Sequence, residues 1–121
     1  MTQEEKTLLI KDICGRILYS PKGVILYHLY DPEEVEVCGY DGQWITVYRD
    51  GDFDNYDAER IRLYLRPMSS MTEEEWKEYH NLRYCDTSNA DRVDFLNAHH
   101  LDYRGLIEKG LALEAPEGMY V

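Results

Sequence analysis

The sequence predicts an α+β fold in a single domain over residues 1–121, with an N-terminal helix, an antiparallel sheet of about four strands, and two or three C-terminal helices packed on the sheet. Three observations lead to this prediction. Capping-box spacings open a helix near each end of the chain, and alternating apolar residues mark strands between them. The 121 residues, 44% of them hydrophobic, are enough to bury a core without disulfides or a metal.

The first helix is expected over residues 3–14. Thr2 stands three residues before Glu5, which is the capping-box spacing, and Gly15 is placed to end the helix in a left-handed conformation. The following residues 24–30 are apolar on both alternating faces. We therefore expect a central strand there, covered on both sides.

Three further strands are expected at residues 35–38, 44–48 and 61–65, because each alternates or is rich in β-branched and aromatic residues. Asp41 and Gly42 form a pair that favours a hairpin between the first two of these strands. Residues 49–57 are expected to be a polar loop. Arginines alternate with apolar residues around the last strand, which predicts a basic outer face.

The C-terminal third is expected to be mainly helical. Thr72 caps a helix with Glu75 three residues on, and the next helix is expected from Ser88 to about residue 100. In that helix Val93 and Leu96 fall on the main apolar stripe, whereas Phe95 falls on the opposite side. A further helical turn is expected over 102–107, followed by a short edge strand at 111–113.

Composition narrows the class of function. The formal net charge of −11 argues against a nucleic-acid partner, because affinity for phosphate backbones comes largely from Lys and Arg. No apolar run reaches the length of a membrane span, and the N-terminus is polar, so we expect a cytoplasmic protein with no membrane partner. Cys14, Cys38 and Cys85 lack zinc-ligand or paired spacing, and no cofactor is expected.

The leading hypothesis is a non-enzymatic module that binds a protein partner with a basic surface. Tyrosine couples a large apolar ring to a polar tip and is favoured in interfaces, and this chain has eleven tyrosines. The expected contact residues are Tyr40, Trp44, Tyr48 and Tyr56, in the region of the strands and their loops. The alternative, that the tyrosines line an ordinary core, stays open at this stage.

A metal-binding protein or metal-dependent enzyme is the second hypothesis. Asp50, Asp52 and Asp54 alternate as in the start of a calcium loop, but Ile61 stands where the bidentate Glu is needed. A second possible set is His99, His100 and Asp102. Adjacent residues on a helix point about 100° apart, so the two imidazoles would not share one ion if both were helical.

Self-association is the third hypothesis. The helical pattern leaves Phe95 on the side away from the main stripe, where it either packs against another element or lies exposed. An exposed Phe95 would be available for an interface between two copies of the chain.

Three segments of the sequence resemble a known group of proteins. The segments 8–14, 64–75 and 95–120, the last containing Asp102-Tyr103-Arg104-Gly105, resemble small uncharacterised proteins carried by phages and mobile elements of gut anaerobic bacteria. The likeness is good at both ends and poor over 24–57. It implies an accessory protein of the bacterial cytoplasm with an adaptable β surface, and it supplies no functional residues.

Overall fold

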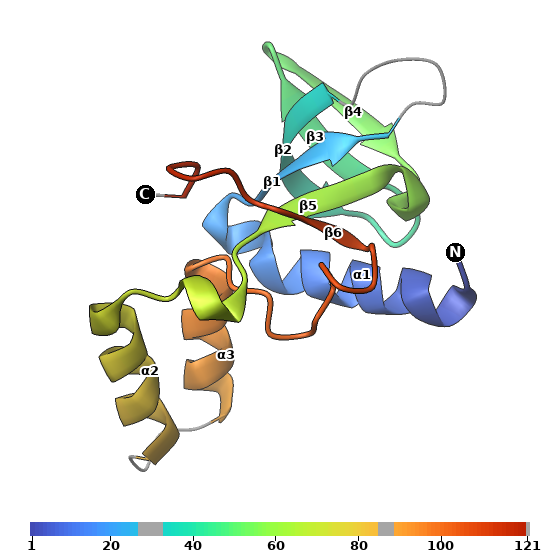
Figure 1. The fold of residues 1–121 in the computed structure, drawn as a ribbon. Helices are drawn as coiled ribbons and strands as arrows, with labels where there is room; N and C mark the ends of the chain where they lie inside the picture. The colour runs from blue at the N-terminus through green and yellow to red at the C-terminus, as the bar shows by residue number, and fades with distance from the viewer. Residues whose placement is uncertain (27–32, 85–88, 121) are drawn as a thin grey trace.

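The computed structural model describes residues 1–26, 33–84 and 89–120 (Figure 1). The α+β class predicted from the sequence is confirmed. In chain order, the elements are α1 (Gln3–Arg16), the 3₁₀ helix η1 (Ile17–Tyr19), β1 (Lys22–Ile25), β2 (Glu33–Tyr40), β3 (Ile45–Arg49), β4 (Asp52–Tyr56), η2 (Ala58–Arg60), β5 (Ile61–Leu65), η3 (Met68–Ser70), α2 (Glu73–Tyr84), α3 (Asn89–Ala98) and β6 (Ala112–Glu114).

The strands form one mixed sheet of six strands in the order β4-β3-β2-β1-β5-β6. Four pairings are antiparallel, and β6 lies parallel to β5. The expected sheet of about four antiparallel strands was therefore too small. The edge strand expected at 111–113 is confirmed at Ala112–Glu114, and the strand expected at 24–30 is described only as far as β1, because 27–32 lie outside the described residues.

The strand missing from the prediction is β4, which lies at the other edge of the sheet. Residues 49–57 were expected to be a polar loop. Instead Asp50 and Gly51 form a two-residue turn with φ values of 50° and 88°, the left-handed conformations that a tight hairpin requires. The chain then pairs back along β3 from Asp52 to Tyr56.

One face of the sheet is covered by α1 and by the chain between α3 and β6 (Figure 1). Leu9 and Ile13 of α1 are fully buried, and so are Leu63 and Leu65 of the sheet. These side chains belong to one core cluster with Leu106 of the later segment. The inner face of the sheet is thus occupied by the protein itself.

The start of α1 is as predicted, but its end is not. The Thr2 hydroxyl accepts a hydrogen bond from the Glu5 amide, and the Glu5 carboxylate accepts one from the Thr2 amide, so the capping box is confirmed. Gly15 does not end the helix, which continues to Arg16. A Cβ at Gly15 would lie 3.2 Å from the Asn97 side chain, so this glycine serves the packing of α3 on α1.

The two later helices lie side by side, away from the strands (Figure 1). The capping box at Thr72 and Glu75 is confirmed. The prediction that these helices pack on the sheet was wrong, because they form a second apolar cluster that also includes Leu101. The predicted apolar stripe of α3 is confirmed for Leu96, which is 5% exposed, but not for Val93, which is 37% exposed. Of the two alternatives for Phe95, packing against another element holds, because Phe95 is 7% exposed within this cluster.

After α3 the chain makes turns instead of the expected helical turn over 102–107. The two carboxylate oxygens of Asp102 accept hydrogen bonds from the amides of Leu106 and Ile107, at 2.9 and 3.0 Å. A short acidic side chain that binds downstream amides in this way competes with helix formation. Among the described residues, no helix is long and apolar enough to cross a membrane.

We predict that Gly23→Ala destabilises the fold by about 1–3 kcal/mol, the usual cost of overpacking a filled core. A Cβ at Gly23 of β1 would lie 2.7 Å from the Arg62 carbonyl oxygen on β5, and backbone cannot easily move aside. Gly39→Ala in β2 is the matched control, because its nearest contact would be 4.0 Å away. Urea denaturation of both variants measures the difference, and equal losses would contradict the prediction.

Candidate functional site

The aromatic pair Tyr48 and Phe53 lies on the outer face of the sheet, at the β3–β4 hairpin. The two residues are cross-strand partners, and their ring centroids are 5.0 Å apart with the planes tilted by 55°. Tyr48 is 38% exposed and Phe53 is 66% exposed, whereas Ile45 and Val47 of the same strand point inward and are buried. The alternation of a pleated strand therefore places the pair opposite the core.

The four predicted contact residues are divided between the two faces. Tyr40 and Tyr56 are both paired with Ile45, so they share its inward side, and both pack half-buried against the main core. Trp44 lies in the loop before β3 and is 39% exposed, and Tyr48 lies on the outer face. Trp44 and Tyr48 are thus partly exposed to solvent, whereas Tyr40 and Tyr56 pack against the core.

Phe53 was not among the four predicted contact residues, although it is more exposed than any of them. The signal was present, since Asp50-Gly51 is the dipeptide that favours a tight hairpin, and it follows a strong β-strand pattern. Reading residues 52–56 as the return strand would have placed Phe53 opposite Tyr48 and outside the core.

Acidic side chains lie beside Tyr48 on this face of the sheet. Glu36 of β2 is the cross-strand partner of Tyr48 on β3, and it is also the cross-strand partner of Lys22 on β1. A shallow hollow of about 260 Å³ beside Tyr48 is lined by four acids and two bases, namely Glu33, Glu34, Glu36, Asp50, Lys22 and Arg49. Because Arg49 is itself paired with Glu33 and with Asp54, the surface beside the rings carries an excess of negative charge.

The predicted calcium-like residues are distributed over a hairpin rather than around one point. Asp50 is in the turn, Asp52 is the cross-strand partner of Arg49, and Asp54 forms an ion pair with Arg49 at 3.6 Å. In the described ranges, no three His, Cys, Asp or Glu side chains are grouped so that they could hold an ion.

The second metal set is also dispersed. His99 Nδ1 contacts Glu75 at 2.9 Å, His100 stacks on Tyr120 with ring centroids 3.7 Å apart, and the Asp102 carboxylate binds backbone amides. His100 has a φ of 58° and lies in the turn after α3, so the two histidines are directed to different neighbours.

Arg66 and Glu75 link the end of β5 to the start of α2. The guanidinium donates two hydrogen bonds to the Glu75 carboxylate, at 2.8 and 2.7 Å, and a third to the His99 carbonyl. These hydrogen bonds from Arg66 are the main reason that the pKa of Glu75 is lowered to about 2. A hollow of about 510 Å³ beside this pair is lined by His99, His100 and Tyr120, but the polar groups of Arg66 and Glu75 are already engaged with each other.

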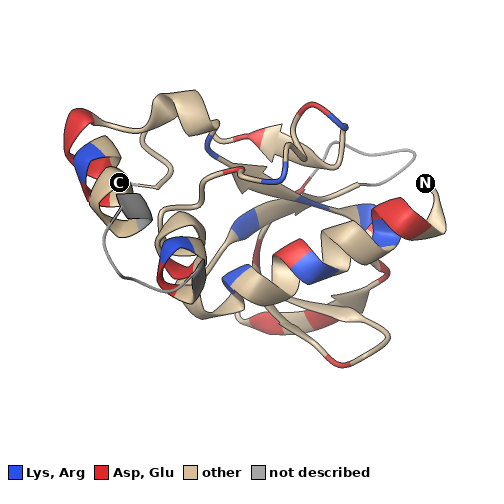
Figure 2. Ribbon diagram, turned by 90° about the horizontal axis from the view of Figure 1, so that it is seen from below, with Lys and Arg blue, Asp and Glu red and all other residues tan. Residues whose placement is uncertain are grey.

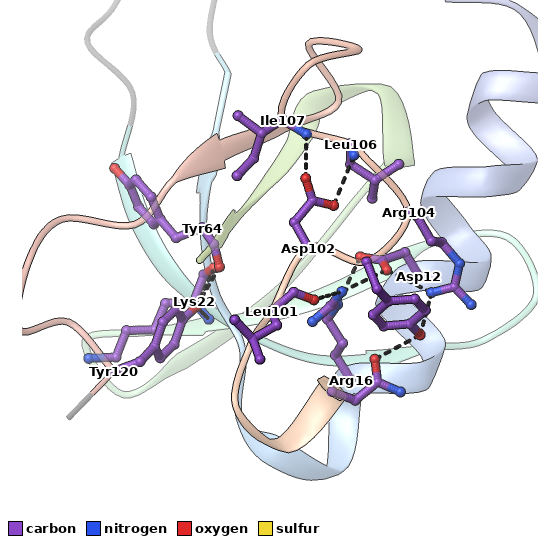
Figure 3. A network of polar contacts seen from close by, with 12 residues as sticks. Asp12, Arg16, Lys22, Tyr64, Leu101, Asp102, Arg104, Leu106, Ile107 and Tyr120 are labelled. Atoms are coloured by element: carbon purple, nitrogen blue, oxygen red, sulfur yellow. Dashed lines mark hydrogen bonds and ion pairs between the residues drawn. The ribbon is translucent and has the colours of Figure 1, made fainter. Parts of the chain in front are cut away.

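A buried polar network joins α1 to the segment after α3 (Figure 3). Asp12 and Arg16 are both 0% exposed, and Arg16 Nε donates to Asp12 at 2.9 Å. Arg16 Nη2 also donates to the Leu101 carbonyl at 2.8 Å, and Arg104 Nη1 donates to Asp12 at 2.8 Å. A fully enclosed pair of this kind has no access to a substrate, so we assign it a structural role.

The C-terminal segment is attached to the sheet through Tyr120. Its hydroxyl accepts a hydrogen bond from the Lys22 amide at 2.8 Å and donates to the Tyr64 carbonyl at 2.8 Å. Burial raises the pKa of Tyr120 to about 12 and lowers the pKa of the stacked His100 to about 4. The perturbed groups therefore belong to contacts that hold the fold together.

Comparison with known proteins gave no relative. No protein-family model matches the chain, and neither the curated proteins nor the solved structures contain a match.

We predict that Asp12→Ala lowers the free energy of unfolding by about 3–5 kcal/mol, because it leaves the buried Arg16 guanidinium without its carboxylate. The control is Glu73→Ala, which removes an exposed ion pair with Lys77 and should cost less than about 1 kcal/mol. Chemical denaturation gives both values. A loss at Asp12 no larger than that at Glu73 would refute the structural role.

Stability should also depend on pH through His100. Its pKa is 6.5 in the unfolded chain and about 4 in the fold, so the unfolded state takes up a proton first as the pH falls. The free energy of unfolding should therefore decrease between pH 6.5 and 4. His100→Asn, which tolerates the positive φ, should show a smaller decrease in denaturation curves over this window. An unchanged slope would argue against a buried neutral imidazole.

Proposed function

We propose that this chain is a non-enzymatic module that binds a protein partner with a basic surface, through the outer face of the β3–β4 hairpin. The observation that supports it best is Phe53, which is 66% exposed and whose ring contacts the Tyr48 ring in a tilted arrangement. Aromatic residues are enriched at the centre of protein interfaces, where they supply much of the binding energy. Trp44, also exposed, extends the proposed contact surface.

Charge supports the choice of partner. The chain carries a net charge of −11, and Figure 2 shows acidic residues on helices and strands alike. A field of this sign accelerates encounter with a basic surface, and the excess of acids beside Tyr48 favours that partner at the contact itself. A nucleic-acid backbone would be repelled by the same field.

The titratable groups of the described chain favour binding over catalysis. Glu75, His100 and Tyr120 have the most strongly shifted pKa values, and each is engaged in contacts within the fold. Asp12 and Arg16 are enclosed. We find no specific observation that favours the metal-binding alternative, because its candidate ligands are directed to separate partners.

The cellular context is part of the proposal. A phage or mobile-element origin rests on the resemblance of the two ends of the chain. A cytoplasmic location is in keeping with Cys14 and Cys38, which are both free thiols. Self-association through Phe95 loses its basis, because that ring is buried between α2 and α3 and lies 6.1 Å from the Tyr79 ring.

The test compares capture of partners from a bacterial lysate by the immobilised wild-type protein and by Phe53→Ser. We expect the variant to lose a partner that the wild type retains at low salt and releases as the salt concentration rises, because the contact combines an apolar anchor with opposite charges. Quantitative mass spectrometry of the eluates measures both effects.

Leu18→Ser is the matched control, since Leu18 is an exposed apolar residue, 89% exposed, that lies in η1 and outside the hairpin. It should retain the partner. Equal capture by wild type and Phe53→Ser, or loss in both variants, would reject the outer face as the binding surface.

A further inference from the structure

The edge of β4 is open. Among the described residues, β4 is paired only with β3, and all its residues except the half-buried Tyr56 are exposed. We propose that an extended segment of the partner, with alternating basic and apolar residues, adds to this edge as a further strand. The inference rests on the proposed function and specifies the partner's chemistry.

The backbone of β4 has amides and carbonyls directed away from β3 that could pair with a further strand. In a hairpin with a two-residue turn, the pair that flanks the turn, here Arg49 and Asp52, exchanges both backbone hydrogen bonds, and successive pairs then alternate. By this alternation Asp52 and Asp54 direct their amides and carbonyls to β3. Phe53 and Asn55 direct theirs to the open side, where a new strand would meet them.

The side chains of β4 specify what the added strand should carry. Phe53 and Asn55 lie on the outer face, so a residue paired beside Phe53 would gain by being apolar. Asp52 and Asp54 lie on the other side, and half of the Asp54 side chain is exposed, at 52%. A strand with Lys or Arg at alternate positions would place its cations beside these carboxylates.

The same features argue against a second copy as the occupant. Proteins protect open edges with Pro, bulges or charged side chains, and β4 has neither a Pro nor a break in its register with β3. The charged side chains that protect the β4 edge are the carboxylates of Asp52 and Asp54. Another copy would bring identical carboxylates to the edge on a chain with a net charge of −11, whereas a basic segment would neutralise them.

The probe for the test is a short blocked peptide of alternating lysine and valine, titrated into the full-length isotope-labelled protein. NMR measures binding and amide hydrogen exchange. We expect the Phe53 and Asn55 amides to become protected on binding, because they would then donate to the peptide. Added salt should weaken the affinity several-fold, and a peptide of alternating glutamate and valine should not bind.

Asn55 offers a matched pair of variants. Asn55→Pro removes an amide that is directed to the open side and leaves the β3 ladder intact, so peptide affinity should fall by about tenfold or more, equivalent to about 1.4 kcal/mol. Asn55→Ala removes the side chain, which accepts a hydrogen bond from Thr46, but keeps the amide. Its affinity should stay within about twofold of the wild type.

Three results would overturn the inference. Peptide binding without protection of the two amides would place the partner on the face of the sheet, and the proposed function would survive. No peptide binding, with Phe53-dependent capture still observed, would reject only the added strand. Protection that appears without peptide, together with a dimer in sedimentation, would identify a second copy as the occupant. If Asn55→Pro fails to fold, amide protection in the wild type remains decisive.

Discussion

The buried pair of Asp12 and Arg16 is the constraint on which the arrangement of the molecule depends. A guanidinium with no exposure to solvent requires a carboxylate and further acceptors, because an unpaired buried charge is costly. Asp12 supplies the carboxylate from the same helix, but the Leu101 carbonyl and Arg104 come from the segment after α3. The contacts of this pair therefore join α1 to the segment after α3, and Asp102 next to Leu101 holds the following turn in place.

This arrangement decides which surface is left for a partner. With α1 and the segment around Leu106 packed under the sheet, the inner face of the sheet is covered by the main core cluster. The helical pair α2 and α3 buries Phe95 in a cluster of its own, apart from the sheet, and leaves Trp76 52% exposed. On the outer face at β3 and β4, the rings of Tyr48 and Phe53 contact each other in a tilted arrangement and are exposed to solvent, and among the described residues the backbone of the edge strand β4 is open. Binding is therefore proposed where the internal packing has no use for the aromatic side chains.

Local signals in the sequence predicted well wherever a few neighbouring residues determine the structure. Both capping boxes are of this kind, since Thr2 with Glu5 and Thr72 with Glu75 form their hydrogen bonds within one turn. The faces of α3 were predicted only in part, with Leu96 buried as expected but Val93 exposed, because helical periodicity shows which residues share a side but does not show which side meets another element. Phe95 is buried because α2 lies against it, through Tyr79, and that contact is tertiary.

The sequence by itself determined the α+β class, most of the strands, the helix starts and the excess of negative charge, because these depend on composition and on short-range periodicity. Only the tertiary structure decided which aromatic rings are available to a partner. Tyr40 and Tyr56 pack on the core while Phe53 does not, because the register of β4 on β3 sets which side of the sheet each residue occupies. The same holds for the metal alternative: His99, His100 and Asp102 are close in sequence, but each is bound by a different neighbour in the fold.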